Sequence, residues 1–84
     1  MYVIVVYDVD ATRTEIFKKI CQIFLIRIQN SVFEGEINEA QLMRLKSNIT
    51  KKVKENDKVK IWITSKIIKE FRIGKYDTVE DGIL

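Results

Sequence analysis

The chain of 84 residues has no histidine, no proline and a single cysteine, Cys21. Without histidine there is no Ser-His triad, no histidine-based RNA cleavage and no histidine-ligated zinc. One cysteine excludes an internal disulfide and a thiolate zinc site, and we interpret Cys21 as a small buried apolar residue. The three glycines, at positions 35, 74 and 82, are too scattered for a phosphate-binding loop. Carboxylate chemistry with a hard metal ion remains, or no chemistry at all.

Long apolar segments are also missing. No run approaches the length of a membrane span, and Asp8 and Asp10 interrupt the apolar N-terminus too early for a signal peptide. We therefore expect no membrane partner and a reducing, cytoplasmic location. The length predicts one domain, residues 1–84. Hydrophobic residues make up 46% of it, so we expect apolar surface left over for a second copy of the chain.

Positive charge is modest overall, at a net +3, but it is concentrated. Between positions 44 and 60 two acidic residues accompany seven basic ones: Arg44, Lys46, Lys51, Lys52, Lys54, Lys58 and Lys60. Basic density of this kind can follow a phosphate backbone. The alternative is an ordinary solvated helix face.

The N-terminal run Tyr-Val-Ile-Val-Val-Tyr predicts a strand over residues 2–7, buried on both faces. Asp8 follows where this strand leaves the sheet, a good position for a metal ligand. A single carboxylate holds Mg²⁺ weakly. If a two-fold axis passes the strand end, Asp8 meets its mate and a two-carboxylate site forms, able to activate water for phosphodiester cleavage. The alternative is that Asp8 is a turn or capping residue.

The next segment predicts a helix and a hairpin. Thr12 and Glu15 have capping-box spacing, with Asp10 as a competing cap. An apolar stripe follows at helical spacing: Ile16, Phe17, Ile20, Ile23 and Phe24. Asn30 and Ser31 predict a hairpin turn, and Gly35 a bulge or a close backbone approach.

A second helix is expected from Asn38, its cap with Gln41, to a break at Asn56-Asp57. Its apolar face comprises Leu42, Leu45, Ile49 and Val53. Residues 58–64 alternate as a strand, with Trp62 outward as a partner contact or a base-stacking surface. Residues 70–74 predict one more short strand. The order βαββαβ, then a short β, predicts an α/β (α+β) ferredoxin-like sandwich.

These residues resemble the CRISPR-associated protein 2 family over nearly the whole chain. Tyr7-Asp8 after the apolar strand is similar to the family's opening motif, and Gln-Asn-Ser-Val-Phe-Glu-Gly at 29–35 to its central hairpin motif. Ile73-Gly74 resembles the tail strand that crosses onto the other subunit, so residues from about 66 to 84 are expected to pack on the partner.

The resemblance implies a ferredoxin-like homodimer that is a metal-dependent endonuclease of RNA or double-stranded DNA. It also implies a bridge between copies of the CRISPR-associated protein 1 integrase during spacer acquisition. Asp8 is then the catalytic residue associated with Mg²⁺ (or Mn²⁺). The other positions linked to activity are Tyr7, Arg13, Arg27, Ser31 and Phe33. Many members carry a second basic residue where this chain has Glu15.

For nucleic-acid binding we expect contributions from Arg13, Arg27, Lys46, Lys51, Lys52 and Lys54. Two other functions remain open: a non-catalytic nucleic-acid-binding scaffold, and a toxin-like mRNA endoribonuclease of related fold. A ferredoxin-like RNA-binding module is disfavoured because its typical basic-glycine-aromatic motif is missing.

Overall fold

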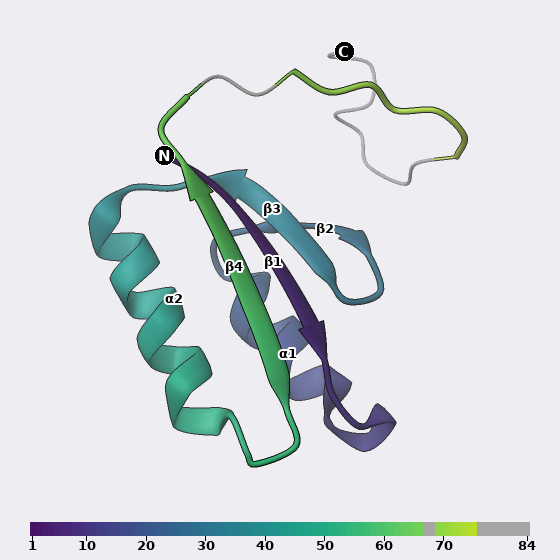
Figure 1. The fold of residues 1–84 in the computed structure, drawn as a ribbon, viewed down its shortest axis with the longest axis vertical. Helices are drawn as coiled ribbons and strands as arrows, with labels where there is room; N and C mark the ends of the chain where they lie inside the picture. The colour runs from purple at the N-terminus through teal and green to yellow at the C-terminus, as the bar shows by residue number, and fades with distance from the viewer. Residues whose placement is uncertain (67–68, 76–84) are drawn as a thin grey trace.

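A four-stranded antiparallel sheet forms the centre of the molecule, and two helices cover one of its faces (Figure 1). The structure is a computed structural model and describes residues 1–66 and 69–75. The strand order across the sheet is β2-β3-β1-β4. We call the sheet face away from the helices the open face.

The elements follow the expected order. They are β1 (Tyr2–Asp8), a 3₁₀ turn η1 (Ala11–Arg13), α1 (Thr14–Cys21), β2 (Ile26–Gln29), β3 (Val32–Glu36), α2 (Glu39–Lys52) and β4 (Lys58–Thr64). This order, with β1 between β3 and β4, confirms the α+β ferredoxin-like sandwich.

Strand β1 is central but is buried on one face only. Val3, Val5 and Tyr7 point toward the helices and are at most 3% exposed, whereas Ile4 and Val6 on the open face are only partly buried. The expectation of burial on both faces is therefore wrong for the single chain, because no layer covers the open face. The core on the helix side is completed by Phe17, Phe33 and Leu45, each fully buried.

The start of α1 differs from the predicted capping box. Asp10 caps the η1 turn, accepting hydrogen bonds from the backbone N–H and the hydroxyl of Thr12. The helix then begins at Thr14 without a side-chain cap, so Thr12 and Glu15 do not satisfy each other. It also ends early, at Cys21, which leaves Ile23 of the predicted apolar stripe 60% exposed.

Helix α2 begins as predicted. Asn38 accepts a hydrogen bond from the Gln41 backbone N–H (2.8 Å), and the Gln41 side chain accepts one from the Asn38 N–H (3.0 Å). Its apolar residues Leu42, Leu45 and Ile49 are buried. The helix ends at Lys52, before the predicted break, so that Val53 lies outside it and is 40% exposed.

The hairpin turn at Asn30-Ser31 is confirmed between β2 and β3. The irregularity in this pair lies between Arg27 and Gln29, not at Gly35. Gly35 is instead a close approach, since a Cβ there would lie 3.2 Å from Leu25 Cδ2.

Strand β4 has the predicted bounds, residues 58–64, and Trp62 lies on the open face. Ile63 lies on the helix side of the sheet, opposite Val3, but is 48% exposed because β4 is an edge strand. The additional strand expected at residues 70–74 is not formed in the single chain, and Phe71 and Ile73 are 90% and 88% exposed. Residues 67–68 and 76–84 of the expected partner-packing tail lie outside the described residues.

Candidate functional site

Asp8 is the last residue of β1, and its side chain is exposed. Because side chains alternate along a strand, Asp8 shares the open face with Tyr2, Ile4 and Val6. Lys58 lies opposite it on β4. The predicted catalytic carboxylate therefore stands on the face that the helices leave uncovered.

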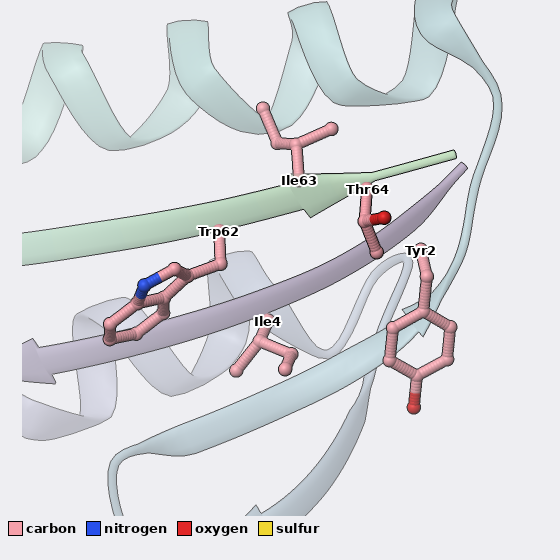
Figure 2. Close-up of a pocket in the computed structure, with 5 residues that line it drawn as sticks. All are labelled: Tyr2, Ile4, Trp62, Ile63 and Thr64. Carbon is pink, nitrogen blue, oxygen red and sulfur yellow. The ribbon is translucent and has the colours of Figure 1, made fainter. Parts of the chain in front are cut away.

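The same face carries an apolar hollow of about 440 Å³. Figure 2 shows its lining: Tyr2, Ile4, Trp62, Ile63 and Thr64, with Ile63 directed toward α2. Trp62 is 47% exposed, and the Lys60 ammonium lies 4.7 Å from its ring centroid. Burial and the neighbouring Glu34 raise the pKa of Tyr2, which stays neutral. An apolar hollow rimmed by polar and charged residues is a candidate interaction surface.

One copy of the chain does not form a metal centre by itself. In residues 1–66 and 69–75 no three carboxylate or thiol side chains come together as a ligand set. Mg²⁺ is held through oxygen ligands, commonly one or two carboxylates with water and substrate phosphates. Asp8 offers one such carboxylate, which lies at the minimum of this range, and a second copy of the chain could bring another.

Tyr7 and Phe33 lie on the opposite, helix-covered side. The Tyr7 ring packs 5.6 Å from Phe17 and 6.1 Å from Phe33 between centroids, and its hydroxyl donates to the Asn30 carbonyl (3.3 Å). Burial raises the pKa of Tyr7. Phe33 is fully buried and packs against Tyr7, so in the single chain it offers no surface to a ligand.

Arg13 is held in place by other parts of the chain. Its Nε lies 3.2 Å from each carboxylate oxygen of Asp57, and its Nη2 lies 2.7 Å from Asp57 Oδ2 and 2.7 Å from the Lys52 carbonyl. Its guanidinium also lies 5.8 Å from the Phe17 ring centroid. The Arg13 guanidinium holds the pKa of Asp57 below its ordinary value. This arrangement joins the start of α1 to the loop between α2 and β4.

Arg27 and Ser31 lie at the β2–β3 hairpin beside Tyr7. Arg27 Nη2 donates to Asn30 Oδ1 (2.6 Å), and Tyr7 N donates to the Ser31 carbonyl (3.1 Å). A polar pocket of about 230 Å³ opens here, lined by Tyr7, Thr14, Glu15, Lys18, Arg27, Asn30 and Ser31.

Sequence reasoning missed Thr14, Lys18 and Asn30 as pocket residues. The spacing of Thr14 and Lys18 on one face of α1 was a usable signal.

The residues predicted to contact nucleic acid lie in different parts of the structure. Lys46, Lys51 and Lys52 are exposed on α2, and Lys54 follows it. Arg27 lies at the polar pocket, and Arg13 is paired with Asp57. The structure thus brings Tyr7, Arg27 and Ser31 together, and leaves Asp8 on the other face of the same strand end.

Membrane insertion has no helical candidate in the described part of the chain, where neither helix is long and apolar enough to cross a bilayer.

Comparison with known proteins supports one family. Residues 1–70 match the family model of CRISPR associated protein Cas2. Among the relatives named CRISPR-associated endoribonuclease Cas2, two illustrate the similarity. The one from Methanosarcina acetivorans is 33% identical over 96% of this chain and 86% of its own length. The one from Pyrococcus furiosus is 45% identical over 67% of this chain, and the match spans 66% of its own length.

A solved structure described as that of cas2 superposes with a TM-score of 0.81, at 40% identity, over 94% of this chain and 91% of its own. The fold thus agrees with the sequence match. The chain belongs to the CRISPR associated protein Cas2 family.

Proposed function

We propose that two copies of this chain pair through the open face and form an endoribonuclease centred on their two Asp8 carboxylates. The observation that carries this proposal is that Asp8 shares its face with the apolar hollow around Ile4 and Trp62. Covering the hollow with a second copy removes apolar surface from water, which favours association. A two-fold axis near the end of β1 then places one Asp8 opposite the other.

The paired carboxylates suit a divalent cation, Mg²⁺ or Mn²⁺, better than one Asp8 alone. When bound there, such an ion would lower the pKa of a water molecule and so supply a nucleophile for phosphodiester cleavage. The residues of the chain bind and orient the strand: Lys58 and Lys60 lie on the same face as Asp8 and attract the phosphate backbone. The names of the relatives, which are endoribonucleases, support RNA as the substrate.

Asp8→Asn tests the catalytic proposal. It removes the charge that holds the ion but keeps the size of an exposed side chain, so the fold and the pairing should persist. We expect Mg²⁺-dependent cleavage of single-stranded RNA to fall to the level of buffer. Asp10→Asn is the matched control, because asparagine also caps a helix and the variant should cleave like the wild type. Cleavage by Asp8→Asn at the wild-type rate would contradict the proposal.

A second function is supported by the exposed lysines of α2. We propose that the paired molecule also holds duplex DNA on this basic surface and bridges copies of the CRISPR-associated protein 1 integrase. Lys51 and Lys52 lie in the last turn of α2 and are exposed. This role needs no catalysis and corresponds to the scaffold alternative. The family match favours a CRISPR-associated protein over a toxin-like ribonuclease.

Charge reversal of both Lys51 and Lys52 to glutamate should weaken duplex binding and flatten its dependence on salt, because fewer counterions are released. Reversal of Lys19 and Lys66, which are also exposed, changes the net charge equally and serves as the control. Equal affinity in the two double variants and the wild type would show that the α2 lysines are ordinary surface.

A further inference from the structure

The polar pocket between the start of α1 and the β2–β3 hairpin is lined by charged side chains of both signs. Lys18 and Arg27 bring two cations to a cavity of about 230 Å³, and Glu15 brings a carboxylate to the same cavity. This volume is below the roughly 300 Å³ at which pockets for drug-sized molecules begin. It therefore suits a ligand the size of one sugar-phosphate unit.

The hydrogen-bond donors of the pocket suit a phosphate. Arg27 is oriented by Asn30 Oδ1 (2.6 Å) and the Gln29 carbonyl (3.4 Å), which leaves further N–H groups of its guanidinium available. Lys18 adds an ammonium that makes no ion pair with any residue in the described ranges. With the Glu15 carboxylate included, the two cations leave the pocket a net charge of +1, which matches the single negative charge of a phosphodiester.

The Glu15 carboxylate is exposed and hydrated in the free protein, and it suits a hydrogen-bond donor rather than a phosphate. Its expected capping role is taken by Asp10, and its carboxylate makes no hydrogen bond or ion pair with the described residues. An ionised carboxylate only accepts hydrogen bonds, so a phosphate alone leaves it unpartnered. The ribose 2′-hydroxyl is a donor that an RNA backbone has and a DNA backbone lacks.

We propose that this pocket binds one ribonucleotide unit of an RNA strand, with its phosphate on Lys18 and Arg27 and its 2′-hydroxyl donating to Glu15. Glu15 is thereby the residue that distinguishes RNA from DNA. The inference rests on the proposed function, because the same strand continues to Asp8. Tyr7 and Asp8 are adjacent and face opposite sides of the sheet, so a strand that crosses the end of β1 reaches both places.

The test is binding without cleavage. The affinities of a six-nucleotide oligouridylate and of its 2′-deoxy counterpart are measured in EDTA, for the full chain and three variants: Glu15→Ala, Lys18→Ala and the control Glu39→Ala. Glu39 is an exposed carboxylate in the first turn of α2, outside the pocket. Wild type and Glu39→Ala should prefer the ribo-oligomer by about three- to tenfold, the worth of one hydrogen bond.

Glu15→Ala should bring this ratio close to one, and Lys18→Ala should weaken both oligomers by a similar factor while keeping the ratio. An unchanged ratio in Glu15→Ala, or no ribo preference in the wild type, overturns the inference. The cleavage test of Asp8→Asn is independent of this result. If cleavage depends on Asp8 and the ratio does not depend on Glu15, only the pocket assignment fails.

Discussion

Asp8 and Arg13 are five residues apart, but their side chains differ in how strongly the rest of the chain holds them. Asp8 stands exposed on the open face, where a ligand or a second chain can reach it. Arg13 is 18% exposed and forms a two-pronged ion pair with Asp57, whose side chain is 4% exposed. Bidentate pairs of this kind are stronger and more specific in geometry than single contacts. Arg13 is therefore better described as a residue that positions the loop before β4 than as a free contact for nucleic acid.

The Arg13–Asp57 pair predicts an acid-sensitive contribution to stability. The pKa of Asp57 is lowered by its hydrogen bonds to Arg13, from an ordinary value of 3.8. The stabilisation is fully present above that ordinary value, which the unfolded chain keeps, and it is lost as the pH falls through the lower pKa of the folded state. Urea unfolding of the wild type should thus show a midpoint that declines below about pH 4.

Asp57→Asn should be less stable at neutral pH and show a shallower decline with acid. Part of the decline should persist, because the pKa of Asp10 is lowered by Thr12 in the same way. An Asp57→Asn midpoint that follows the wild-type curve at every pH would show that the pair contributes nothing.

Helix α2 shows how a short local sequence sets where an element begins. Its N-terminal capping box lies within four consecutive residues, Asn38 to Gln41, and satisfies backbone N–H groups that the helix leaves unpaired. Leu42, Leu45 and Ile49 repeat at spacings of three and four and form the buried face. The helix is therefore fixed at its start by polar contacts and along its length by packing.

Asn38→Ala should destabilise the folded chain by about 1 kcal/mol, the usual cost of losing a helix cap. Guanidinium or urea unfolding measures the free energy of unfolding directly. Ser47→Ala, on the exposed side of the same helix, is the control and should change it by less than about 0.5 kcal/mol. If the two variants are equally stable, the capping box is not a significant source of stability.

Several elements set by neighbouring residues could be predicted, although the Thr12–Glu15 capping box was wrong. Contacts between distant residues could not be predicted. The bounds of β4, the turn at Asn30-Ser31 and the cap at Asn38 all follow from short patterns. The Arg13–Asp57 pair joins residues 44 apart, and no periodicity signals it. The same holds for the polar pocket, where α1 meets the hairpin. Whether Ile4 and Phe71 are exposed depends on the presence of a second layer over them. No short sequence pattern indicates whether that layer exists.

At the scale of the molecule, the main feature is a two-layer sandwich that leaves one sheet face uncovered (Figure 1). That face carries the hollow around Ile4 and Trp62, and it also carries Asp8 at the end of β1. The exposed tail residues Phe71 and Ile73 add apolar surface to the single chain. A small domain gains stability by covering such surfaces with a partner.

Ile4→Glu should prevent pairing, because it introduces a charge into the centre of the open face. Light scattering after size-exclusion chromatography should give the mass of two chains for the wild type and of one chain for the variant. Ile23→Glu is the control: Ile23 is 60% exposed, follows α1 and lies outside the open face, so the mass of two chains should persist. An Ile4→Glu protein of unchanged mass would place the interface elsewhere.

A crystal structure of the full chain with Mg²⁺ tests the central claim most directly. We predict two copies related by a two-fold axis, with their open faces in contact and their Asp8 side chains directed toward each other near that axis. Isolated chains, or a pair in which the two Asp8 side chains lie on opposite outer surfaces, would contradict the account.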